Sequence, residues 1–337
     1  MGALAIAVPY VLFVWWFSTG TVLFLVGLSS RHKIFLKVGA AALFVASLVG
    51  VAGSSQATDT AGVFCVFTCA ILLWGAVEIS LLAGWITGPR PKSCPRGCAP
   101  NDRIWFALQA IAYHELALIA TGGLIFAVTA GAPNQLGWWT FVALLVLRQS
   151  AKINLFLGVR TLNDELLPAQ VDFLRSYFAH KPMNALFPFS VTLATASAAF
   201  LAAAAIDSIS NFEALAYSLL AVLVALGALE HWFMVLPMPV VDLWRWSVRA
   251  SSARIETPTT EPTTRPLLSV IPGGAAMAER PPPTKSAAWL ARQRLEDQFR
   301  QAYREQQATA RAASDIADVA TQSTSIGINR MTDGSAS

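Results

Sequence analysis

The sequence predicts an all-α membrane protein, a bundle of about seven transmembrane helices followed by a mostly disordered tail. The 337 residues are 55% hydrophobic and only 13% charged, whereas soluble chains carry about 25% charged residues. Seven runs are apolar over the roughly 20 residues that a helix needs to cross a bilayer. Among the loops, only alternate ones carry basic residues. Together these observations predict a polytopic fold.

The predicted spans all lie within residues 1–250, which we take as the membrane domain. The second and sixth spans are rich in alanine and are the weaker ones by composition. The seven spans are 4–28, 35–53, 62–87, 104–130, 136–157, 185–206 and 213–236.

The loop charges predict the orientation of the bundle. Lys and Arg occur in the loops after the first, third, fifth and seventh spans, whereas loops 54–61, 131–135 and 207–212 contain neither. Positive charge is retained on the cytoplasmic side. We therefore expect an external N-terminus and a cytoplasmic C-terminus. The net charge of +4 then reflects cytoplasmic loops and gives no reason to expect a nucleic-acid partner.

Seven acidic, basic or histidine side chains lie well inside the predicted spans, away from the first residues of a span, where a charge is costly unless it is paired. They form the intramembrane polar cluster: Glu78, His114, Glu115, Arg148, Lys152, Glu230 and His231. Arg148 and Lys152 are four residues apart and share one helix face. At about 1.5 Å per residue, all seven groups lie roughly 8–15 Å from the cytoplasmic end of their span. We expect the two cations to neutralise the three carboxylates across helices.

Four interpretations of this cluster remain open. It could be a structural contact that holds the helices in register, or a carboxylate–histidine site for one or two metal ions. His114 or His231 could instead be the axial ligand of a tetrapyrrole, or the groups could form a proton or quinone path. Arg148 and Lys152 would compete with a metal for the carboxylates, and no E-x-x-H spacing occurs, so the structural interpretation is favoured.

The cysteines and the motif content give little support for catalysis. Cys65 and Cys69 lie in an apolar run, and Cys94 and Cys98 lie in the basic loop sequence CPRGC. A C-x3-C pair without further ligands is a weak zinc signal, so we expect four unlinked thiols. The sequence has no P-loop, HExxH or G-x-S-x-G motif, and we expect no enzymatic activity.

The long loop 158–184 is predicted to carry a short helix at the cytoplasmic interface. Pro168 suits the first turn of a helix, and Leu167, Val171, Leu174 and Phe178 recur at helical spacing. Aromatic and basic residues alternate there and form the predicted partner surface: Phe173, Arg175, Tyr177, Phe178 and Lys181. A plain connecting helix is the alternative.

The segment after the seventh span reads MPVVDLWRWSVR, and its tryptophans and arginines are typical of an interfacial anchor. From 251 to 337 the composition changes to a Pro/Thr-rich, polar tail. We expect this cytoplasmic tail to be largely disordered, with one helix near 286–312.

Several stretches resemble the photosynthetic complex assembly protein PuhE family of phototrophic bacteria. They cover about residues 10–247, and the long run at 150–168 is unlike a generic membrane helix. The matching stretches are WWFSTG (15–20), WGAVEISLLAGWITGPR (74–90), YHELAL (113–118), GAPNQ with WTF (131–141), SAKINLFLGVRTLNDELLP (150–168), PMNALFP with SVT (182–192) and LEHWFMVLP (229–237).

The resemblance implies a role in building the reaction centre and its light-harvesting antenna, with an effect on bacteriochlorophyll supply. It implies a location in the bacterial inner (photosynthetic) membrane, with the lipid bilayer and reaction-centre or light-harvesting subunits as partners. Genes of that family lie near the gene of the reaction-centre H subunit, and the family has no established catalytic residues. The alternative is an integral membrane enzyme or pigment carrier of tetrapyrrole metabolism. That protein would use the Glu/His cluster and bind bacteriochlorophyll or a precursor.

Overall fold

The computed structural model describes residues 2–27, 33–95, 97–162, 166–236, 238, 240–244 and 246–247. These residues belong to the first of two compact units, Met1–Glu261; the second unit is Pro262–Ser337. The helix predicted near 286–312 lies outside the described residues, as do Arg245 and Arg249. In the described ranges, seven helices are long and apolar enough to cross a membrane, which confirms the predicted fold class.

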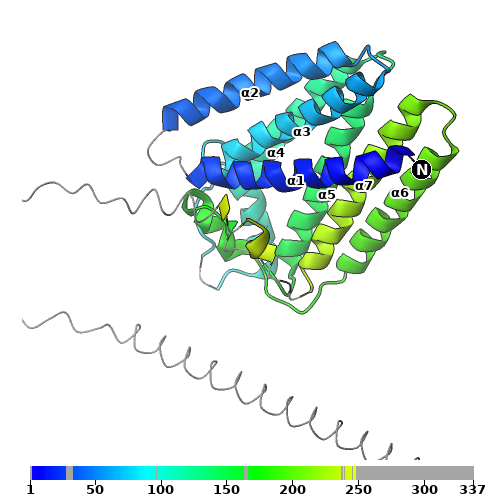
Figure 1. Ribbon diagram of the computed structural model, residues 1–337. Helices are drawn as coiled ribbons and strands as arrows, with labels where there is room; N and C mark the ends of the chain where they lie inside the picture. Colours follow the sequence, from blue (N-terminus) through cyan, green and yellow to red (C-terminus); the bar gives the residue numbers. More distant parts are fainter. Residues whose placement is uncertain are drawn as a thin grey trace, which may run out of the picture. The chain divides into compact units, whose positions relative to one another are not determined.

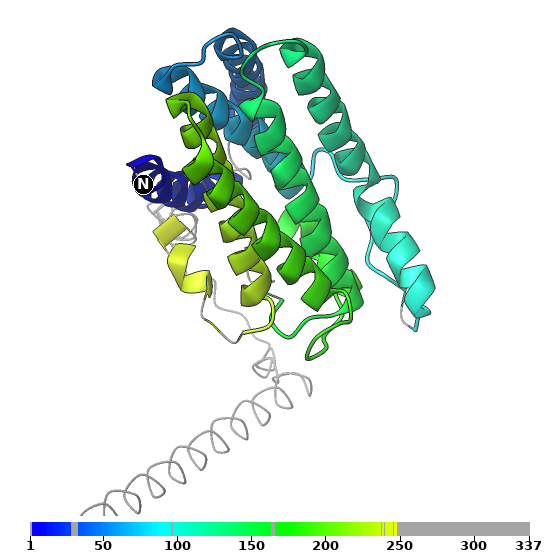
Figure 2. The same ribbon diagram turned by 90° about the vertical axis from the view of Figure 1, so that its right-hand side faces the viewer.

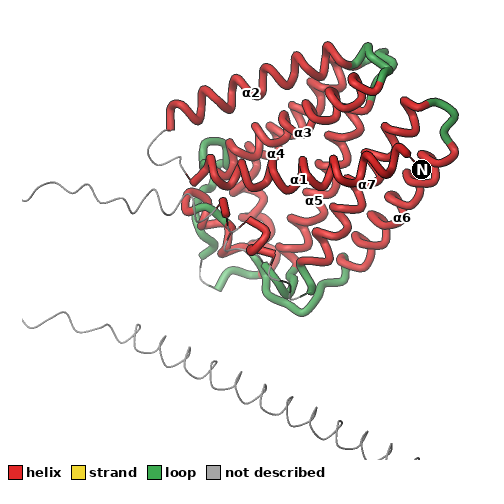
Figure 3. Tube along the Cα trace, in the orientation of Figure 1, coloured by secondary structure: helices red, strands yellow, loops and turns green. Residues whose placement is uncertain are grey.

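Figure 1 shows the seven helices in chain order. They are α1 (Gly2–Gly27), α2 (Lys33–Ser54), α3 (Thr60–Leu82), α4 (Pro100–Thr129), α5 (Leu136–Leu157), α6 (Phe187–Asp207) and α7 (Asn211–Phe233). Two 3₁₀ helices follow α5 and α7: η2 (Ala169–Tyr177) and η3 (Val240–Trp244). The basic loops between α3 and α4 and between α5 and α6 lie at one end of the bundle, and the loops without Lys or Arg lie at the other, as the tube in Figure 3 shows.

The third helix ends earlier than the sequence predicted. We expected it to continue to residue 87, but α3 ends at Leu82. Gly84 adopts a positive φ of 74°, a conformation that glycine reaches without steric cost and that commonly ends a helix. The apolar residues that follow, Trp85 and Ile86, continue the hydropathy signal without continuing the helix.

The core of the bundle is built around α3 and α7. In an apolar 18-residue stretch of each of these helices 56% and 61% of the residues are buried, whereas the share is 17% for α1, α2 and α6. A large cluster of buried apolar side chains fills this core and includes Phe67, Leu73, Leu118, Phe141 and Leu219. The outer helices therefore present most of their apolar surface outward, which is compatible with contact to lipid.

Two buried asparagines organise the helix starts. Asn134 donates from Nδ2 to the Ala57 carbonyl at 2.9 Å, and its Oδ1 accepts from the amide of Leu136 at 3.2 Å. Asn184 donates to the Gly158 carbonyl at 3.0 Å and accepts from the amide of Leu186 at 2.9 Å. Each side chain thus satisfies a free N–H at a helix start and joins two loops.

The segment after α3 lies in direct backbone contact with α4. The Thr87 carbonyl accepts a hydrogen bond from the amide of His114 at 3.0 Å, and in Figure 2 this loop runs beside the middle of α4. A Cβ atom placed on Gly88 would lie 2.1 Å from the carbonyl oxygen of Gln109. Only glycine permits this approach, and the contact holds His114 in position.

The C-terminal end of the described chain packs against α1. Trp244 Nε1 donates to the carbonyl of Trp16, and Trp16 Nε1 donates to the carbonyl of Leu243, both at 3.0 Å. Trp244 is only 5% exposed. This tryptophan therefore lies against the protein and not at the lipid interface, where the sequence placed it; Trp246 is 42% exposed.

Replacing Gly88 by alanine is expected to lower the amount of folded protein several-fold. The added Cβ would collide with backbone atoms of α4, which cannot move aside as a flexible side chain can. The measurement is the monodisperse fraction in detergent after mild heating. Gly123→Ala in α4 is the matched control, because a Cβ at Gly123 meets nothing within 4 Å. Equal behaviour of the two variants would contradict the proposed contact.

Candidate functional site

Two acid–base pairs lie inside the bundle, and both use cations on α5. Arg148 Nη2 donates to Oε2 of Glu78 on α3 at 3.3 Å. Lys152 Nζ donates to Oε1 of Glu115 on α4 at 2.6 Å. The spacing of four residues thus directs the two cations to acids on two different helices.

His114 extends the first pair into a row of three groups. Its ring is completely buried, and Nε2 lies 3.8 Å from Glu78 Oε1, which is beyond hydrogen-bond distance. Neither ring nitrogen of His114 nor Glu78 Oε1 has a hydrogen-bond partner among the described residues. Buried polar atoms without partners are costly and rare, so this row is a candidate functional feature.

Glu230 and His231 find partners that the sequence argument did not assign to them. Glu230 Oε1 accepts from the indole Nε1 of Trp15 on α1 at 2.5 Å, and no direct ion pair with Arg148 or Lys152 occurs in the structure's described part. His231 Nδ1 donates to the Gly227 carbonyl at 2.7 Å, and its Nε2 lies 2.9 Å from Ser150 Oγ. Both nitrogens of His231 are therefore engaged.

Four residues of this network were missed by the charge-based search: Trp15, Gln149, Ser150 and Asn154. Gln149 donates to Glu115 Oε2, and the buried Asn154 donates to Ser190 Oγ on α6 at 3.0 Å. The three polar residues on α5 interrupt an apolar helix, a signal that could have found them. Trp15 carries no comparable signal, because an aromatic residue in a span is ordinary.

A cavity of about 260 Å³ lies among α1, α3, α5 and α7. Glu78, Arg148 and Glu230 line it together with Trp15, and apolar residues such as Leu223 form the rest of its wall. Its volume is near the lower end of the range of about 300–1,000 Å³ that is usual for small-molecule sites. The cavity is thus small and mostly apolar, with a few charged groups on its wall.

Neither histidine is placed to ligate a tetrapyrrole through its ring in this structure. Among the described residues, no group of three His, Cys, Asp or Glu side chains could hold a metal ion. An axial histidine needs a free ring nitrogen with open space beyond it. The nitrogens of His231 are engaged, and His114 is completely buried. Either ring would have to leave its place to bind a macrocycle.

The predicted partner surface is only partly a surface. Arg175 and Lys181 are exposed, and Phe173 and Phe178 are half-buried. Tyr177, however, is 0% exposed and packs with Val171 and Leu174. The segment is 3₁₀-helical with a non-helical kink at Val171, and Val171, Leu174 and Tyr177 lie in one buried cluster. The apolar residues of this segment therefore pack against the rest of the protein, and Tyr177 does not belong to the exposed partner surface.

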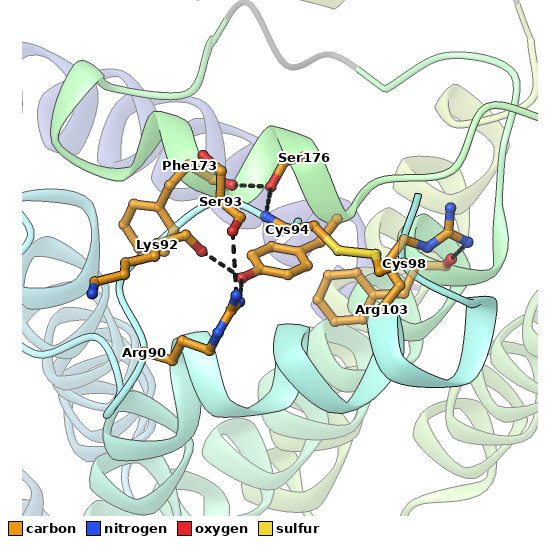
Figure 4. Close-up of a disulfide and its surroundings, with 10 residues drawn as sticks. Arg90, Lys92, Ser93, Cys94, Cys98, Arg103, Phe173 and Ser176 are labelled. Carbon is orange, nitrogen blue, oxygen red and sulfur yellow. Dashed lines mark hydrogen bonds between the residues drawn. A yellow bond between two sulfur atoms is a disulfide. The ribbon is translucent and has the colours of Figure 1, made fainter. Parts of the chain in front are cut away.

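The cysteines also differ from expectation. Cys65 and Cys69 are free thiols, but Cys94 and Cys98 form a disulfide (Figure 4). Gly97 between them adopts a positive φ of 77°, which lets the short loop turn back on itself. The prediction of four unlinked thiols is wrong for this pair, because sequence spacing alone does not reveal the turn.

Replacing Lys152 by methionine is expected to destabilise the protein strongly. Removing one partner of a buried ion pair costs about 3–5 kcal/mol, because the other charge stays buried. The double variant Lys152→Met with Glu115→Gln should recover part of this loss, as measured by unfolding in detergent. The control is Asp172→Asn at the exposed pair with Arg175, where a change within about 0.5 kcal/mol is expected. Additive effects of the two cluster substitutions would refute the pairing.

Comparisons with known proteins identify the family of this chain. An uncharacterised 30.4 kDa protein in the puhA 5′ region of Rhodobacter capsulatus is 36% identical over 250 residues, covering 73% of this chain and 91% of that protein. No solved structure matches the chain. A family model described as "Protein of unknown function (DUF3623)" matches residues 1–255. The chain therefore belongs to the DUF3623 family.

Proposed function

We propose that this chain is an assembly factor for the photosynthetic reaction centre and light-harvesting complexes in a bacterial inner membrane. The observation that carries the proposal is the relative's place in the puhA 5′ region of Rhodobacter capsulatus. The resemblance to the PuhE family, whose genes lie near that of the reaction-centre H subunit, agrees with it. The chain would bind reaction-centre or light-harvesting subunits and perform no chemical step of its own.

The structure contributes two features that suit a binding role. The outer helices leave most of their apolar surface uncovered, so that the helices of a partner subunit can pack against them within the bilayer. Arg175 and Lys181 are exposed beside the half-buried Phe173 and Phe178, which gives the basic end of the bundle a mixed aromatic and cationic surface. Aromatic residues and arginine are enriched at protein interfaces.

The cavity beside Glu230 favours a second candidate, a carrier or enzyme of tetrapyrrole metabolism. Its wall combines apolar side chains with charged ones, as a site for an amphiphilic ligand does. This candidate predicts that bacteriochlorophyll or a precursor is recovered with the purified protein. A colourless protein from pigment-producing cells would count against it.

The test of the assembly proposal is the near-infrared absorbance spectrum of membranes from a phototrophically grown deletion strain. Reaction-centre or antenna bands should fall and should return when the wild-type gene is supplied. Normal amounts of extracted pigment with reduced bands would indicate assembly, whereas reduced pigment would indicate an effect on supply. An unchanged spectrum would contradict both roles.

Supplying the deletion strain with the Glu230→Gln variant tests whether the cavity charge is used. The amide still offers an oxygen to Trp15, so the protein should accumulate normally, but the negative charge on the cavity wall is lost. We expect several-fold weaker restoration of the bands. Glu213→Gln, at the exposed start of the same helix, is the matched control and should restore them. Full restoration by Glu230→Gln would show that the negative charge in the cavity is not needed for the function.

A further inference from the structure

The loop between α3 and α4 carries the disulfide of Cys94 and Cys98, four residues apart. Both residues are half-buried and reach the surface of the loop. Figure 4 shows the bond with Arg90, Lys92, Ser93 and Ser176 around it. The pair is therefore accessible to a second molecule, unlike a disulfide inside a core.

The position of this loop conflicts with a permanent disulfide. Its basic residues place it on the cytoplasmic side in the predicted orientation. Cytoplasmic thiols are kept reduced, and disulfides found there are usually transient, either catalytic or redox-sensing. Where the fold brings two cysteines together in such a compartment, the bond between them is expected to form and break as the redox state of the compartment changes.

The surroundings of the pair favour thiolate chemistry. Cys98 directly precedes Ala99, the N-terminal cap of α4. A helix N-terminus stabilises a thiolate and makes it a better leaving group. When a thiolate attacks the Cys94 sulfur, Cys98 is therefore released as a thiolate beside the N-terminus of α4, where its charge is stabilised.

The residues beside the bond are hydrogen-bonded to η2. The amide of Cys94 donates to Ser176 Oγ at 2.8 Å. The Tyr177 hydroxyl donates to the Lys92 carbonyl and accepts from Arg90 Nη1, both at 2.5 Å. Burial raises the pKa of the Tyr177 hydroxyl, which keeps its proton available for donation. The state of the loop is thereby linked to the segment that carries Phe173 and Arg175.

We propose that Cys94 and Cys98 are a thiol–disulfide exchange site for a cytoplasmic dithiol protein, and that the bond controls how firmly η2 is held. One thiolate of the reductant attacks the Cys94 sulfur, the intramolecular S–S bond breaks, and Cys98 leaves as a thiolate. The second thiol of the reductant then releases Cys94. Two electrons and two protons pass to the pair, and the reductant becomes a disulfide. The exchange does not depend on the proposed function; only its effect on assembly does.

The first experiment measures the redox state of the wild-type, full-length chain in native membranes. Thiols are alkylated with isotopically distinct reagents before and after reduction, and each cysteine is quantified by mass spectrometry. Dithiothreitol is the dithiol probe and glutathione disulfide the oxidant. Cys94 and Cys98 should switch together and reversibly without unfolding, whereas Cys65 and Cys69 serve as internal controls that stay reduced. A pair that resists dithiothreitol in the folded protein, or that never oxidises, would overturn the proposal.

The second experiment tests the link to η2 by trypsin cleavage after Arg175 in inside-out vesicles. Reduction should raise the cleavage rate several-fold, and a Cys94→Ala/Cys98→Ala variant should be cut quickly in both redox states. Ser176→Ala, which removes the acceptor for the Cys94 amide, should raise cleavage while leaving the exchange intact. Equal cleavage of the oxidised and reduced wild type would overturn the control of η2. Neither readout involves photosynthesis, so failure here is distinct from failure of the assembly proposal.

Discussion

The pairing of buried charges between helices is the constraint on which the rest of the bundle depends. A carboxylate or ammonium group facing hydrocarbon is costly, so α3 and α4 must meet α5 at the depth where Glu78 and Glu115 reach Arg148 and Lys152. This requirement fixes the rotation of α5 about its own axis. Once it is met, α1 and α7 close over the remaining acid through Trp15 and Glu230, and the cavity is the space left among these helices.

Backbone groups impose the second constraint, at the ends of the helices. A free N–H or C=O near the membrane needs a partner within the protein. Asn134 and Asn184 meet this need by serving two loops each, and the loop at Gly88 meets it by lying on the backbone of α4. Uncharged groups therefore hold the loops in place, whereas ion pairs join the helices.

Hydropathy and charge alternation predicted the seven spans, because burial in lipid demands long apolar segments whatever their packing partners are. Helical spacing also placed Arg148 and Lys152 on one face. Sequence could not reveal the partner of Glu230, since depth is readable from the chain but rotation is not, and an indole donor carries no charge. It also misjudged Tyr177, because the segment 169–177 is a 3₁₀ helix and not an α-helix, and it missed the turn at Gly97 that joins two cysteines.

The order of the helices along the chain gives the charge pairs an order in time. Synthesis proceeds from the N-terminus, so Glu78 on α3 and Glu115 on α4 enter the membrane before α5 supplies either cation. For Glu230 the order is reversed, because its partner Trp15 on α1 is inserted long before Glu230 on α7. The nascent chain therefore becomes electrically balanced only when α5 is inserted. Until then Glu78 and Glu115 have no cationic partner within the chain, and their charge must be met by water, lipid head groups or protonation.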